Sequence, residues 1–166
     1  MPLDETRTDA TIDTWCTPEH VLVLVRRVLG GRILLDPCTT ADNPTSAQHM
    51  YTAAGDTHPW IAGWFCNPPY GGALKAWSKQ IAYQGVLRSK EGIALVPCRP
   101  DTAWYETLST SCAAEIFWRR RIRFVRPPGD TRPADSPKFP NVMFYYGPHV
   151  DRVREVFADH ARVWVK

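Results

Sequence analysis

One short motif, Asn67-Pro68-Pro69-Tyr70, indicates chemistry on a planar amino group and is called the tetrad below. An amine conjugated to an aromatic ring, such as N6 of adenine, is a poor nucleophile because its lone pair is delocalised into the ring. Two acceptors aimed at its two hydrogens would concentrate that lone pair on nitrogen. The side-chain carbonyl of Asn67 and the backbone carbonyl of Pro68 suit that role, and such a site also stabilises charge that develops on nitrogen.

The remaining members of the tetrad fix this geometry. Proline has no N–H and restricts the residue before it, so Pro68 and Pro69 hold the turn extended and set the direction of the carbonyls. Tyr70 offers a flat surface on which a flipped base can stack, worth about 1–3 kcal/mol. The competing interpretation is a simple turn, because Asn-Pro is a common turn signal.

The elements around the tetrad predict where it lies. An apolar strand at 63–66 precedes it and a helix at 73–87 follows it. Asp36 closes another apolar run, and Arg99 follows a third. Ligands of open parallel sheets bind beyond the carboxyl ends of the strands, so we expect Asp36, Asn67 and Arg99 along one edge.

Apolar strands alternate with helices along the chain. The other expected strands are 32–36, 48–52, 92–97, 114–118, 141–146 and 162–165, and the other expected helices are 101–111, 149–160 and one that starts at Thr17-Pro18-Glu19 and ends at Gly30-Gly31. In that first helix, Thr17 is the expected cap and Pro18 the first helical residue. This order predicts an α/β fold, a mostly parallel sheet with helices on both faces. The 166 residues predict one domain, 15–166, behind a flexible leader at 1–14.

Composition excludes several classes of protein. The 44% hydrophobic content argues against disorder, and no apolar run is long enough to span a membrane. The acidic start is unlike a signal peptide, so we expect a cytoplasmic protein without a membrane partner. The five cysteines form no C-x-x-C pair, which argues against disulfides and zinc. Cys38, Cys66 and Cys98 each follow or end a strand, and we expect buried filler there and no metal.

Positive charge is concentrated in one segment. Six arginines lie between Arg119 and Arg132 against one acid, Asp130, which gives a local net charge of +5 that can attract phosphates. Because this run alternates with Ile122 and Phe124, it predicts a strand whose arginines point away from the core. The proline-rich stretch 127–140 predicts an exposed loop.

Five stretches together carry a family resemblance: Thr14-Trp15-Cys16-Thr17-Pro18, Leu35-Asp36-Pro37-Cys38, Trp64-Phe65-Cys66-Asn67-Pro68-Pro69-Tyr70-Gly71, Leu95-Val96-Pro97-Cys98-Arg99-Pro100-Asp101-Thr102 and Arg121-Ile122-Arg123-Phe124. The chain resembles the phage-type DNA N6-adenine methyltransferases, with the same order of motifs over about residues 14–146. The resemblance implies a single-domain Rossmann-like methyltransferase fold, S-adenosylmethionine as methyl donor and double-stranded DNA as partner. It also implies a bacterial cell or a prophage as the setting.

The resemblance assigns cofactor contacts to matching positions. Asp36, Pro37 and Cys38 match the motif around the methionine end, with Asn67 beside them, and a strand-end carboxylate suits the ammonium. Asp36 as a turn residue is the alternative. Thr17 and Pro18 match the contact with the cofactor carboxylate, where a helix N-terminus suits an anion.

The first loop departs from the glycine-rich form that many methyltransferases carry. Residues 38–42 read Cys-Thr-Thr-Ala-Asp instead. A carboxylate is expected on the cofactor ribose, from Asp42 or Asp56, and Asp56 is favoured for the adenine side. Trp15 and Trp104 are the candidate pocket walls.

DNA contacts are expected from Tyr70, Arg99, Arg119, Arg121 and Arg123. For Arg99, an ion pair with Asp101 is an equal alternative.

Two other functions stay open. The tetrad also serves methylation of cytosine N4, RNA bases and protein glutamine, and the unusual first loop allows a DNA-binding remnant without catalysis. No separate recognition domain fits in this length, which predicts an enzyme of low or very short site specificity, or recognition shared across a homodimer.

Overall fold

The core of the protein is a single seven-stranded sheet in the computed structural model, which describes residues 15–131 and 139–166. The strands are β1 (Leu35–Asp36), β2 (His49–Met50), β3 (Trp64–Cys66), β4 (Gly92–Pro97), β5 (Ala114–Trp118), β6 (Asn141–Tyr146) and β7 (Ala161–Val165), in the spatial order β2-β1-β3-β4-β6-β5-β7. Strands β1 to β5 run in one direction, and β6 and β7 run against it. The predicted α/β fold with a mostly parallel sheet is confirmed.

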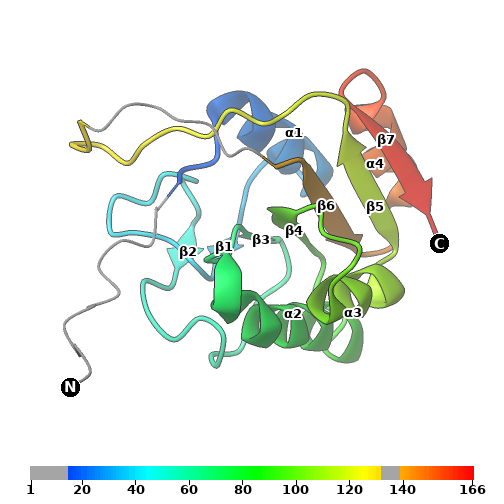
Figure 1. Ribbon diagram of the computed structural model, residues 1–166, viewed down its shortest axis with the longest axis horizontal. Coiled ribbons are helices and arrows are strands. Elements are labelled where there is room, and N and C mark those ends of the chain that lie inside the picture. The colour runs from blue at the N-terminus through cyan, green and yellow to red at the C-terminus, as the bar shows by residue number, and fades with distance from the viewer. Residues whose placement is uncertain (1–14, 132–138) are drawn as a thin grey trace, which may run out of the picture.

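Helices cover both faces of this sheet (Figure 1). They are α1 (Glu19–Val28), α2 (Leu74–Ala82), α3 (Ala103–Ser111) and α4 (Val150–Phe157). One core cluster joins α1 and α4 to Ile93 and Leu95 of β4, and the other joins α2 and α3 to Ala94 and Val96. A strand that is buried on both faces must be apolar throughout, which explains the continuous run in β4. No helix in the described part of the chain is long and apolar enough to cross a membrane.

The start of α1 differs from the prediction. Pro18 occupies the N-cap position, and Thr17 lies before it without a capping hydrogen bond. The Thr17 hydroxyl instead faces Asn67, so its role belongs to the cavity described below. The end of α1 is as predicted: Gly30 adopts φ 81°, and the Gly31 N–H donates to Arg26 O at 2.7 Å, a Schellman-type end.

The predicted helix at 73–87 is divided into three parts. A 3₁₀ turn (Gly71–Ala73) leads into α2, and a π-helical turn (Tyr83–Leu87) follows it. In the π turn, Gly85 packs so closely on the Tyr146 ring that a Cβ would lie 2.3 Å from it. The periodicity of apolar residues predicted the helix, but it did not predict the π-helical turn in which Gly85 contacts Tyr146.

The arginine-rich segment is not the strand that its alternation predicted. Ile122 and Phe124 are buried and the arginines at 119, 120, 121 and 123 are exposed, but these residues lie outside the sheet. The segment leaves the end of β5 and crosses to the chain before α1, where Val125 forms an isolated bridge with Cys16 (Figure 1). Alternate side chains of this segment are therefore buried because an extended loop packs on the core, and not because a strand pairs in the sheet. Arg132, the predicted leader at 1–14 and part of the 127–140 loop lie outside the described residues.

Candidate active site

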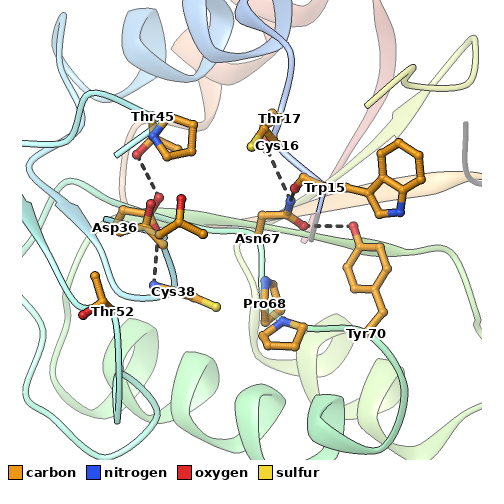
Figure 2. Close-up of a pocket in the computed structure, with 14 residues that line it drawn as sticks. Trp15, Cys16, Thr17, Asp36, Cys38, Thr45, Thr52, Asn67, Pro68 and Tyr70 are labelled. Atoms are coloured by element: carbon orange, nitrogen blue, oxygen red, sulfur yellow. Dashed lines mark hydrogen bonds between the residues drawn. The ribbon is translucent and has the colours of Figure 1, made fainter. Parts of the chain in front are cut away.

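A cavity of about 270 Å³ opens beyond the carboxyl ends of β1 and β3. Its wall contains Asp36 from the end of β1 and the tetrad that follows β3 (Figure 2). The chain before α1 completes the wall with Trp15 and Thr17. The structure thus brings together Asp36 and Asn67, which the sequence separates by thirty residues. Ligand pockets measure roughly 300–1,000 Å³, so this cavity is near their lower end.

The side chain of Asn67 is held in one orientation. Its Nδ2 donates to the Trp15 carbonyl at 3.3 Å and to Thr17 Oγ1 at 3.4 Å. A backbone carbonyl can only accept, so Nδ2 must face Trp15 and Oδ1 must face the other way. Asn67 Oδ1 is directed toward Tyr70, as Figure 2 shows. The chain before α1 therefore determines that the Asn67 side chain directs its acceptor, Oδ1, toward Tyr70 within the tetrad.

The turn that carries Asn67 is shaped by its neighbours. Pro68 and Pro69 line the cavity and contribute no N–H donors to it. Gly71 then adopts φ 87°, a conformation that residues with a Cβ rarely adopt, and the chain enters the 3₁₀ turn. A glycine directly after the tetrad is what this sharp change of direction requires.

Tyr70 is fixed by its hydroxyl and by its ring. The hydroxyl donates to Asn67 Oδ1 at 2.9 Å and accepts from Asn141 Nδ2 at 3.4 Å. The ring meets Phe139 edge-on, with centroids 5.7 Å apart. Burial raises the pKa of the Tyr70 hydroxyl well above its usual range, so it remains a proton donor. Sequence reasoning missed Asn141; the only available signal was a polar residue opening the apolar run of β6.

Asp36 is a turn residue and a cavity residue at the same time. Its Oδ1 accepts from the Cys38 N–H at 3.0 Å, and its Oδ2 accepts from the Thr45 hydroxyl at 2.8 Å. Only 3% of Asp36 is exposed, and this burial raises the pKa of the carboxyl, while the hydrogen bonds oppose the rise. A carboxylate has about four lone-pair sites, so Asp36 can accept further donors from a ligand.

The loop after β1 also contributes polar groups to the cavity. Thr40 belongs to the wall, and its Oγ1 is buried without a hydrogen-bond partner among the residues that the structure describes. Buried polar atoms almost always have partners, so this hydroxyl fits a ligand that supplies one. Cys38 lies on the same wall, and burial raises the pKa of its thiol to about 12, with the charges of Asp36 and Asp56 adding to the rise.

Three predicted cofactor residues lie behind the wall rather than on it. Pro18 forms the N-cap of α1, Pro37 directly follows β1, and Asp56 lies in the loop after β2; none of them lines the cavity. Gly55 approaches Pro37 so closely that a Cβ would lie 1.6 Å from the Pro37 carbonyl oxygen. This contact places Asp56 near Cys38, next to the cavity. Of the two candidate tryptophans, Trp15 lines the cavity, whereas Trp104 packs beside Tyr105 on α3.

The three cysteines that follow or end strands have different neighbours. Burial raises the pKa of the Cys66 thiol, with nearby Cys38 adding to the rise, whereas Cys98 contacts the Tyr105 hydroxyl at 3.9 Å. Among the described residues, no group of three or more His, Cys, Asp or Glu side chains is arranged to hold a metal ion.

The candidate DNA contacts have different surroundings. Arg99 is exposed and pairs with Asp101, Nε to Oδ1 at 3.5 Å, which was the alternative interpretation. Arg119 donates to the Ala158 carbonyl at 3.3 Å. Arg121 and Arg123 are exposed on the segment that crosses toward the cavity wall at Trp15.

Comparison with known proteins identifies the family. The family model described as DNA N-6-adenine-methyltransferase (Dam) matches residues 5–160. No curated protein and no solved structure matches the chain. The match includes both sides of the cavity, from Trp15 to the tetrad and on to Asn141. The chain therefore belongs to the DNA N-6-adenine-methyltransferase (Dam) family.

Proposed function

We propose that the protein transfers a methyl group from S-adenosylmethionine to N6 of a flipped adenine in DNA, within the cavity beside the tetrad. The observation that carries this proposal is the fixed orientation of Asn67 in the cavity wall, where Trp15 O holds Nδ2 and Oδ1 is directed toward Tyr70. Membership of the family supports DNA adenine as the acceptor.

The residues fit the cofactor by their chemistry. Asp36 presents a carboxylate for an ammonium, and Thr40 presents a buried hydroxyl without a partner in the described structure. Thr17, with Pro18 and the start of α1, suits a carboxylate. Cys38 lines this cavity with Pro37 directly before it, and Asp56, which lies near Cys38, is proposed to serve the ribose and adenine. When bound there, S-adenosylmethionine supplies a methyl group on a positively charged sulfur.

The chain's own contribution to the reaction is to orient the amine. Asn67 Oδ1 accepts from one N6 hydrogen and Pro68 O from the other, which concentrates the lone pair on nitrogen and directs it along the line of attack. These acceptors also stabilise the positive charge that develops on N6 before its proton is lost to solvent. Tyr70 provides the surface on which the flipped base stacks.

DNA is held by charge and by the tetrad. Arg121 and Arg123, with Arg119 and Arg99 further along the surface, are proposed to contact phosphates, which position the duplex without reading its sequence. Sequence specificity is accordingly low or limited to a very short site, unless a homodimer shares recognition.

The test is mass spectrometry of nucleosides after the protein is incubated with S-adenosylmethionine and either unmethylated genomic DNA or RNA. We expect N6-methyladenine in DNA. The Asn67→Ala variant should lose about 10²–10³ in kcat, the scale for one polar group that stabilises transition-state charge. Calorimetry should show that this variant still binds the cofactor.

Other products would identify the alternatives. Methylation of cytosine N4 or of an RNA base would replace adenine in DNA as the acceptor. Absence of cofactor binding by the wild-type protein, with and without DNA, would indicate a DNA-binding protein without catalysis. An Asn67→Ala variant of full activity would contradict the proposed mechanism.

A further inference from the structure

Asn141 lies behind the tetrad at the first position of β6. It pairs in register with Pro97, the last residue of β4, so the antiparallel insertion of β6 brings it to the edge of the sheet where the cavity opens. Asn141 is 4% exposed and does not belong to the cavity wall. Its contact with the site is made through the Tyr70 hydroxyl.

The amide of Asn141 has a defined orientation. Its Nδ2 lies 3.4 Å from Val96 O and 3.4 Å from the Tyr70 hydroxyl. Val96 O can only accept, so the donor end of the amide must point toward it. Asn141 Oδ1 is then left buried, and it has no hydrogen-bond partner among residues 15–131 and 139–166. A buried acceptor without a donor is unfavourable, so we expect this oxygen to gain a donor in another state of the site.

The three polar side chains form one directed chain. Asn141 donates to the Tyr70 hydroxyl, and that hydroxyl donates to Asn67 Oδ1. The Tyr70 proton therefore takes one of the two lone pairs of the oxygen that the proposed mechanism assigns to the target amine. An amine that takes the same lone pair displaces the hydroxyl, and a displaced hydroxyl in a buried place needs another acceptor.

We propose that Asn141 is a positioning residue for methyl transfer, whose free Oδ1 accepts the Tyr70 hydroxyl proton once the target amine occupies Asn67 Oδ1. Nδ2 and Oδ1 share one carbon atom, so a small tilt of the amide or shift of the ring exchanges the partner of Tyr70. No proton leaves the tyrosine, whose burial keeps it protonated. This inference rests on the proposed function and extends it to a residue that does not touch the substrate.

The test is a double-mutant cycle between Asn141→Leu, which keeps the approximate shape but removes both polar atoms, and Tyr70→Phe, which removes the hydroxyl. Asn141→Leu leaves the hydroxyl with no acceptor except Asn67, so we expect kcat to fall about tenfold, the effect of one hydrogen bond on the transition state. Cofactor affinity should not change. The double variant should regain the kcat of Tyr70→Phe within about threefold, because without a hydroxyl there is nothing to displace.

Equal losses from Asn141→Leu with and without the Tyr70→Phe substitution would overturn the inference, since a packing defect is not corrected by deleting a hydroxyl. An Asn141→Leu enzyme with wild-type kcat would overturn it as well. If Asn141→Leu does not fold, judged by its melting temperature, Asn141→Ala takes its place in the same cycle. The wild-type product is measured first: no N6-methyladenine would defeat the proposed function, whereas an active wild type with additive variants would defeat the role of Asn141 alone.

Discussion

Tyr70 and Asn67 are joined by a hydrogen bond of 2.9 Å, from the tyrosine hydroxyl to the amide oxygen. Both residues belong to the tetrad, and the Tyr70 hydroxyl donates to the same Asn67 oxygen that the proposed mechanism assigns to the target amine. Without substrate, the Tyr70 hydroxyl thus supplies Asn67 Oδ1 with a donor at the place where the target amine is proposed to bind. Buried acceptors are costly to leave unpaired, so this contact stabilises the empty site and competes with the substrate.

Tyr70→Phe should therefore improve or preserve the apparent affinity for DNA. The variant retains the ring for stacking but removes the competing donor, which is worth about 0.5–1.5 kcal/mol, or roughly 2–10-fold in KM. Tyr70→Ala should instead lower kcat/KM by about 10–100-fold through loss of base stacking. Steady-state kinetics on unmethylated genomic DNA measures both. Equal losses in the two variants would show that the hydroxyl, not the ring, carries the function.

The substitution Asp36→Asn should stabilise the fold and at the same time weaken the binding of the cofactor. Burial raises the folded-state pKa of Asp36, so the charged form is disfavoured on folding, and stability falls as pH rises through the window between the ordinary carboxyl value and the raised one. The neutral amide keeps an acceptor for the Cys38 N–H, and its donor can face the Thr45 hydroxyl, which has Asn43 Oδ1 at 3.4 Å as another acceptor.

The melting temperature of Asp36→Asn should thus exceed that of the wild type by a few degrees at pH 7, with the difference vanishing at low pH, on the scale of roughly 2–4 °C per kcal/mol for a domain of this size. Calorimetry should show about 10–100-fold weaker cofactor binding from the lost charge-assisted hydrogen bond. Unchanged cofactor affinity would remove Asp36 from the proposed site.

The sequence predicted those parts of the fold and site that depend on local pattern. The strand at 63–66, the turn of the tetrad and the edge shared with Asp36 follow from apolar runs and from the rule for ligands of parallel sheets. The alternation at Ile122 and Phe124 wrongly predicted a strand, because an extended loop that packs on the core buries alternate side chains just as a strand does. Period alone does not distinguish backbone pairing from packing.

Individual side-chain contacts between distant segments could not be predicted from the sequence. Asn141 reaches Tyr70 only because β6 is inserted antiparallel between β4 and β5, and nothing in its own run of six residues indicates this neighbour. Thr17 was predicted to be a helix cap because only its neighbours in the sequence were visible to the prediction. Its actual partner, Asn67, lies fifty residues away.

Arg121→Ala and Arg123→Ala should weaken DNA binding at low salt and reduce its salt dependence. Each phosphate contact that is lost lowers the slope of log K against log salt by about one. Arg88→Ala is a matched control, because Arg88 is also exposed but lies just before β4, at the opposite ends of the strands. Fluorescence anisotropy over a range of NaCl concentrations measures the slopes. If Arg88→Ala had the same effect as the other two, the binding would depend on overall charge and not on this segment.

Gly55→Ala should destabilise the protein and disturb the wall around Asp36, whereas Gly72→Ala should not. A Cβ at Gly55 would lie 1.6 Å from the Pro37 carbonyl oxygen, a backbone atom that cannot move away without shifting the loop after β1. At Gly72 a Cβ meets nothing within 4 Å. Overpacking of this kind costs about 1–3 kcal/mol, to be measured as the free energy of unfolding in urea. Because Pro37 precedes Cys38, whose N–H bonds Asp36, cofactor affinity should fall in Gly55→Ala as well. A Gly55→Ala protein of wild-type stability and affinity would show that this loop does not shape the cavity.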